Sequence, residues 1–190
     1  VDYDGVGGVA QATFDCTIPC DSTNSPYLAD SISIFQDTLI EGDETVTMTL
    51  SNPSGGLVLG TQINHTATII DDDTAIIDFV LTTDTIAETA GNHIAQARLS
   101  TTINGGSIGG GTLAIPISAT ITRADVDTVG ADFSGATTAT ITFPATSADG
   151  ATQPVTTPIF DDVLAEGNED FTLTLSNLTT TGINVGMSLG

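Results

Sequence analysis

The sequence predicts an all-β fold made of antiparallel β-sandwiches. Short segments alternate apolar and polar residues, as where Phe171, Leu173 and Leu175 are separated by threonines. This period of two is typical of a strand with one buried face. No window longer than about ten residues shows the i, i+3, i+4 apolar pattern of an amphipathic helix. Thr, Gly, Ala, Ile and Val dominate the composition, and β-branched residues favour strands.

The charge of the chain restricts its partners. It carries 24 acidic residues, two basic residues (Arg98 and Arg123) and a formal net charge of −22. A nucleic-acid partner is excluded, because a phosphate backbone is bound through a basic surface that this chain lacks. An anionic membrane surface is disfavoured for the same reason. The carboxylates have almost no protein counter-charge, so we expect solvent, salt or a bound cation to neutralise them.

Hydropathy indicates a folded chain that is not inserted in a membrane. The hydrophobic fraction is 39% and the mean hydropathy is +0.23, which is enough to bury a core. No apolar run approaches the roughly 18 residues that a membrane-spanning helix needs. The chain opens on Val1 without the basic and apolar regions of a signal peptide, so we expect a processed product or a fragment of a longer protein.

One acidic stretch occurs twice. Residues 160–177 read FDDVLAEGNEDFTLTLSN, and residues 35–52 read FQDTLIEGDETVTMTLSN. Glu41 and Glu166 are 125 positions apart in these two copies. Each copy attaches a loop rich in carboxylate oxygens to the start of an alternating strand. The repetition predicts a repeat protein.

Alignment of the two copies predicts how the chain divides. We expect a first domain over 1–73, which is the C-terminal part of a sandwich, and a second over 74–190, which lacks its last strand. The chain is then about one and a half repeats. The strands expected in order are 9–14, 32–35, 45–50, 66–70, 75–81 with 85–88, 93–99, 113–122, 136–143, 155–160 and 171–175. Turn residues separate them, and the glycine-rich segment 105–111 is expected to be a flexible loop.

Two cysteines, Cys16 and Cys20, lie in the sequence CTIPC. Zinc sites usually need a second pair or histidine partners, and redox motifs have two intervening residues instead of three. We therefore expect a small disulfide at a hairpin tip, which indicates an oxidising compartment. His65 and His93 are isolated in sequence and are expected on strand faces. No nucleophile–base arrangement is apparent, so we expect no enzyme activity.

The ordered motifs resemble the Calx-beta family, the calcium-binding β-sandwich of sodium/calcium exchangers, integrin β4 and large bacterial surface proteins. They are IAETAG, GADF, FDDVLAEGNEDF and LTLSN in the second unit, and DY, QDTLIEGDETVTMTLSNPSGG and ATIIDDD in the first. The resemblance implies tandem immunoglobulin-like antiparallel β-sandwiches that bind Ca²⁺ through loops at one end. Calcium prefers several carboxylate oxygens in flexible geometry, which agrees with the acidic loops.

The resemblance also implies two sets of calcium ligands. The first unit would use Asp2, Asp37, Glu41, Glu44, Asp71, Asp72 and Asp73. The second unit would use Glu88, Asp132, Asp161, Asp162, Glu166 and Glu169. Gln36 stands where the second unit has Asp161, which should weaken the first site. The alternative is that these acids only form a solvated surface.

These observations favour a calcium-stiffened structural module of a large extracellular adhesin, surface fibre or filament. Its expected partners are adjacent repeats or neighbouring copies of itself, and a neighbouring subunit would supply the missing strand by β-strand addition. A trimmed fragment explains the same ends. The alternative function is a calcium-sensing regulatory domain of a membrane transporter or receptor. Extra copies of the acidic stretch in the parent protein would favour the fibre, and a hydrophobic span would favour the sensor.

Overall fold

The computed structural model describes residues 32–126, 132–134, 137–165, 167–180 and 186–189, the last as backbone. Its contacts divide the chain into two compact units, Val1–Asp37 and Thr38–Gly190. The expected strand 9–14 and the expected Cys16–Cys20 disulfide lie outside the described residues. The domain boundary expected after Asp73 falls inside the second unit and stays a prediction.

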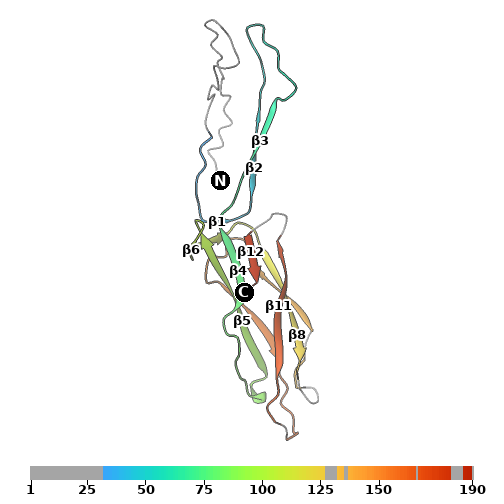
Figure 1. Cartoon of the computed structure of the whole chain (residues 1–190). Helices are drawn as coiled ribbons and strands as arrows, with labels where there is room; N and C mark the ends of the chain where they lie inside the picture. The colour runs from blue at the N-terminus through green and yellow to red at the C-terminus, as the bar shows by residue number, and fades with distance from the viewer. Residues whose placement is uncertain (1–31, 127–131, 135–136, 166, 181–185, 190) are drawn as a thin grey trace. The chain divides into compact units, whose positions relative to one another are not determined.

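The structure is all-β, as predicted (Figure 1). Apart from one 3-10 turn, η1 (Glu88–Ala90), every regular element in the described part is a strand. The strands are β1 (Leu39–Ile40), β2 (Glu44–Thr49), β3 (Asn64–Ile69), β4 (Thr74–Phe79), β5 (Asn92–Ile103), β6 (Ser107–Ile108), β7 (Thr112–Leu113), β8 (Ile117–Asp125), β9 (Thr138–Phe143), β10 (Thr152–Pro158), β11 (Phe171–Thr180) and β12 (Gly186–Leu189).

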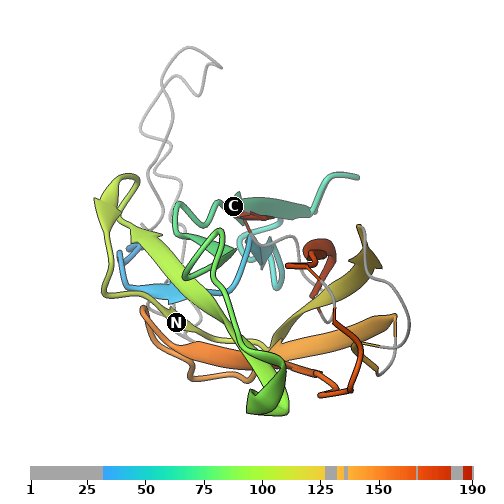
Figure 2. The same ribbon diagram turned by 90° about the horizontal axis from the view of Figure 1, so that it is seen from below.

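Two sheets form a sandwich within the second unit (Figure 2). One sheet has the strand order β10-β5-β4-β12, with β6 paired to β5, and the other has the order β11-β8-β9. All of these pairs are antiparallel except β12 with β4, which is parallel. The β2–β3 pair forms a separate antiparallel hairpin. Antiparallel sheets with one buried face account for the alternating sequence pattern.

The core lies between the two sheets and comes from the alternating positions of their strands. In β8, Ile117, Ala119 and Ile121 are buried while the residues between them are only half-buried. The other buried apolar side chains of the cluster are Ile40, Ala75, Ile77, Ala97, Leu99, Leu113, Ile141, Phe143 and Val155. The predicted period of two is therefore confirmed in the strands that form the sandwich.

Three expected strands differ from the structure. Residues 32–35 contain only an isolated bridge residue, and residues 85–88 lead into η1 instead of extending β4. The expected strand 113–122 is two strands, β7 and β8, because the chain breaks before Pro116, which has no backbone N–H to donate. The fold class is unchanged, since every regular element besides η1 in the described residues is a strand.

The glycine-rich segment is ordered, contrary to expectation. It contains β6, and the Gly109 amide donates to the Thr101 carbonyl at 2.7 Å. Asp149 accepts from the Thr101 amide at 2.7 Å through Oδ1, and its Oδ2 would lie 3.0 Å from a Cβ at Gly109. A Cβ at the buried Gly111 would lie 2.5 Å from Ile40 Cδ1. Glycine is therefore required at residue 111 for close packing.

The acidic loop 36–43 is joined to the sandwich through β1. This strand pairs in parallel with β7, with Leu39 opposite Thr112 and Ile40 opposite Leu113. The Thr112 amide donates to the Thr38 carbonyl at 3.0 Å, and the Ala114 amide donates to the Ile40 carbonyl at 3.1 Å. The Ile40 side chain is fully buried in the core cluster. One apolar residue of the acidic loop therefore completes the core of the sandwich.

Candidate metal centre

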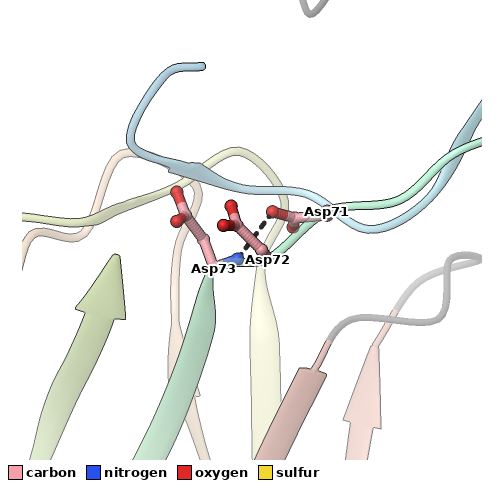
Figure 3. Close-up of side chains that lie close together, drawn as sticks. All are labelled: Asp71, Asp72 and Asp73. Atoms are coloured by element: carbon pink, nitrogen blue, oxygen red, sulfur yellow. Dashed lines mark hydrogen bonds between the residues drawn. The ribbon is translucent and has the colours of Figure 1, made fainter. Parts of the chain in front are cut away.

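Three consecutive aspartates form a carboxylate cluster between β3 and β4 (Figure 3). Each of Asp71, Asp72 and Asp73 offers an oxygen that lies within 4.8 Å of the others. Among the described residues, no other group of three or more His, Cys, Asp or Glu side chains brings its ligand atoms this close together. Asp71 is half-buried, Asp72 is exposed and Asp73 is only 2% exposed. We call this group the Asp71–Asp73 cluster.

Hydrogen bonds orient the cluster and connect it to two loops. Asp71 Oδ2 accepts from the amides of Glu41 and Gly42 at 3.1 and 2.9 Å. Its Oδ1 accepts from the Asp73 amide at 2.9 Å, drawn as a dashed line in Figure 3. Asp73 Oδ1 accepts from the amide of Asn104, in the β5–β6 turn, at 2.7 Å. The cluster thus lies where the acidic loop, the β3–β4 connection and the β5–β6 turn meet.

The donor set of the cluster suits a calcium ion. Calcium takes roughly six to eight oxygen ligands at about 2.3–2.6 Å, so two ligands of one ion lie no more than about 5 Å apart. The 4.8 Å limit among the three carboxylates satisfies this condition. Backbone amides already hold Asp71 and Asp73 in place, which lowers the ordering cost of binding. Asp71, Asp72 and Asp73 are therefore the residues that would hold Ca²⁺ at this position.

Three other ligands expected in the first set, Asp37, Glu41 and Glu44, lie on or next to the acidic loop. Glu41 is half-buried and its amide is bonded to Asp71, while Glu44 is half-buried at the start of β2. Asp37 is half-buried in the first compact unit, and Asp2 lies outside the described residues. Asp43 was not expected as a ligand, yet its Oδ1 accepts from the Asp71 amide at 3.2 Å. Asp43 lies in the repeated acidic stretch, but its counterpart in the second copy is Asn168, so the comparison of the two copies did not point to it.

The loops of the second ligand set are joined by backbone hydrogen bonds at the opposite end of the sandwich. The Ile159 amide donates to the carbonyl of Gly91, which follows η1, at 3.1 Å. The Phe160 amide donates to the Asp132 carbonyl at 2.7 Å, and Phe133 bridges to Ile159. The segments that carry Glu88, Asp132 and Asp161 are thus brought to one end.

The carboxylates of this second set differ in exposure. Asp132 is half-buried, and its Oδ2 is buried without a hydrogen-bond partner among the residues that the structure describes. Buried carboxylate oxygens are costly unless a donor or a cation compensates them. Asp162 Oδ1 accepts from the Leu164 amide. Glu88, Asp161 and Asp162 are exposed, Glu169 is half-buried, and Glu166 lies outside the described residues.

Arg123 positions the loop that carries Asp132. Its side chain projects from β8 into the sandwich and is only 9% exposed. Nε donates to Thr157 Oγ1 at 3.1 Å, and the guanidinium nitrogens donate to the carbonyls of Ser134 and Thr156 at 3.1 and 3.3 Å. Burial lowers the pKa of the guanidinium, although it stays protonated. Arg123 therefore connects β8, β10 and the loop next to Asp132.

His93 lies on a strand, as expected, and its ring packs between the sheets. Nε2 lies 2.8 Å from Asp84 Oδ1, and the ring meets Phe171 edge-on with centroids 5.3 Å apart. Phe171 also packs against Phe133, with centroids 5.2 Å apart. These three rings pack against one another at the end of the core, next to the loops of the second ligand set. The contacts of His93 therefore indicate a packing role.

The fold and the carboxylate cluster define a β-sandwich module with an acidic end whose carboxylates are close enough to share a metal ion. The sequence profile of the Calx-beta domain matches residues 25–74 and 111–188, which is more than half of the chain. The chain therefore belongs to the Calx-beta family, as the motifs predicted. This is a calcium-related family of structural and regulatory modules. Among curated proteins, none matches this sequence.

Proposed function

We propose that this chain is a calcium-binding structural repeat module of a large extracellular adhesin, surface fibre or filament. The observation that carries the proposal is the Asp71–Asp73 cluster, which lies between the acidic loop and the β5–β6 turn of the sandwich. Family membership supports calcium as the ion. Among the described residues, no helix has the length and apolar character to cross a membrane.

The stiffening effect is electrostatic. Without a cation, the three carboxylates of the cluster repel one another and the acidic loop beside them, and two basic residues are available to oppose 24 acidic ones. A bound calcium ion would remove this repulsion, and Asp71, Asp72 and Asp73 would hold it next to the segments that the cluster already contacts through Glu41, Gly42 and Asn104. The β3–β4 connection would then be held rigid against both loops.

Asp72→Asn tests the cluster with little change of shape. The amide keeps one oxygen but loses the charge, so we expect calcium affinity to fall by at least about tenfold, since affinity follows the charge count of the ligands. Calcium titration by calorimetry measures the change. Asp78→Asn is the matched control, because it removes one charge from β4, where Asp78 pairs with Arg98 at 2.8 Å and belongs to neither ligand set. Equal affinities of the two variants would contradict the assignment.

We also infer assembly by β-strand addition beside β11. In the described part of the chain, β11 is at the end of the sheet β11-β8-β9. Its sequence counterpart β2 pairs with β3, with Val46 opposite Ala67 and Thr47 opposite Thr66. A strand of β3-like sequence therefore fits beside β11, and an uncovered edge strand is prone to pairing.

A peptide of residues 62–70 tests this inference. We expect it to bind the chain and to protect the backbone amides of β11 from hydrogen exchange, because an added strand forms new backbone hydrogen bonds. A peptide of the same composition in scrambled order is the control. Equal protection by the two peptides, or none by either, would contradict strand addition.

The alternative function is a calcium-sensing regulatory domain of a transporter or receptor, which also fits the family. The two functions differ in the parent protein. Further copies of the acidic stretch next to this chain would favour the fibre, and a membrane span in the parent would favour the sensor.

A further inference from the structure

The first acidic stretch has an apolar segment that is docked on the sandwich. Residues 38–40 lie along β7, where Ile40 is fully buried and Leu39 is half-buried. Gly111 makes room for this segment, because a Cβ there would lie 2.5 Å from Ile40 Cδ1. We call Gly111 and β7 the socket.

The second acidic stretch carries the counterpart of this segment in an exposed state. The internal repeat places Val163, Leu164 and Ala165 at the positions of Thr38, Leu39 and Ile40. Val163 is 99% exposed and Leu164 is 59% exposed, and Ala165 is exposed as well. Two adjacent apolar side chains of this charged loop are therefore exposed to water, whereas their counterparts in the first stretch pack on β7.

We propose that residues 163–165 dock on the β7-type socket of a further Calx-beta repeat, in the geometry that residues 38–40 adopt on β7. The inference rests on the proposed repeat function but not on calcium. We expect the docked segment to make the same contacts as β1 makes with β7. Two of its backbone carbonyls accept hydrogen bonds, and its third residue is buried. The internal repeat therefore identifies both the docking segment, residues 163–165, and its partner, a further repeat of the same family.

Residues 163–165 fit best in a socket that has less free space than the socket at Gly111. Ala165 is smaller than Ile40, so it leaves part of a socket like that of Gly111 empty. A partner that fits residues 163–165 closely has a larger side chain than glycine at the position of Gly111. A socket that keeps the glycine is filled better when Ala165 is replaced by isoleucine.

An extended chain provides the test. It consists of residues 1–190 followed directly by a second copy of residues 65–190, joined in the register of the internal repeat, so that a socket follows residues 163–165. Ala165→Ile should raise the melting temperature of the extended chain by at least about 3 °C, since roughly 1 kcal/mol of core filling gives a shift of this size. The same substitution in the 190-residue chain should leave the melting temperature within about 1 °C, because residue 165 is then exposed. Equal shifts in the two chains would overturn the proposal.

Leu164→Cys measures docking without relying on a stabilising variant. We expect the thiol at residue 164 to react at least about tenfold more slowly in the extended chain than in the 190-residue chain, after subtraction of the parent chains' own reactivity. Val58→Cys is the control, since Val58 is 89% exposed and should react equally in both. Equal reactivity at residue 164 would overturn the proposal. Repeating both measurements in chelator separates a failure of docking from a failure of calcium binding.

Discussion

Ile40→Ala is expected to lower the free energy of unfolding by about 2–5 kcal/mol, although Ile40 belongs to an acidic loop. The side chain is fully buried in the core cluster and would contact any Cβ placed at Gly111. Its truncation removes buried apolar surface and leaves a cavity that the backbone pairing of β1 with β7 prevents from closing. Denaturant unfolding of the variant and the parent chain measures the loss.

Val58→Ala is the control for this result, because Val58 is 89% exposed and should change stability by no more than about 0.5 kcal/mol. Equal effects of the two substitutions would contradict the docking of β1 and, with it, the template for the docking of residues 163–165.

Arg123→Met is expected to destabilise the chain by at least about 2 kcal/mol. The substitution leaves the carbonyls of Ser134 and Thr156 and the hydroxyl of Thr157 without the donors that they have now. Buried groups that lose a charged donor bear most of their desolvation cost. The loop at Asp132 also loses its connection to β8, so hydrogen exchange at the Phe160 amide, which donates to the Asp132 carbonyl, should become faster.

Arg98→Met is a closely matched control, because Arg98 and Arg123 are the two arginines of the chain, which contains no lysine. Its side chain is 41% exposed and pairs with Asp78 at 2.8 Å across β4 and β5. Ion pairs with such exposure contribute about 0–1 kcal/mol. A loss for Arg98→Met as large as that for Arg123→Met would show that the charge, and not the buried hydrogen bonds, decides the effect.

Much of the sandwich was predictable because its strands bury alternate residues. The pattern also places two of the buried polar side chains, Arg123 and His93. Arg123 continues the buried positions of Ile117, Ala119 and Ile121 in β8, and His93 lies two residues before Ala95 in β5. Periodicity thus assigns a side chain to the interior before its chemical partners are known.

The docking of β1 was not predictable from local sequence. A two-residue parallel pairing between Leu39–Ile40 and Thr112–Leu113 joins positions that are far apart in the chain, and it has no periodic signal. The glycine-rich segment was expected to be flexible because its sequence does not show that Gly111 packs against Ile40. Such close approaches depend on tertiary packing and not on turn propensity.

The candidate metal site was partly predictable. The consecutive aspartates were expected as ligands, and the structure shows that their carboxylates are close enough to share an ion. The bonds from Glu41 and Gly42 to Asp71 follow from tertiary structure, which sequence spacing does not show. The ligands of the second set stay predictions, with Asp132 Oδ2 as their best structural support.

Calcium titration of the chain by calorimetry, with thermal melts in calcium and in chelator, tests the central claim most directly. We predict saturable binding with an affinity in the range of extracellular modules, about 10⁻⁴ to 10⁻³ M, or tighter. A calcium concentration of about 100 times Kd should stabilise the folded state by about 2.7 kcal/mol, because the ion binds the folded chain selectively. No heat of binding and an unchanged melting temperature at about 10 mM calcium, well above that range, would contradict the claim that the acidic loops form a calcium site.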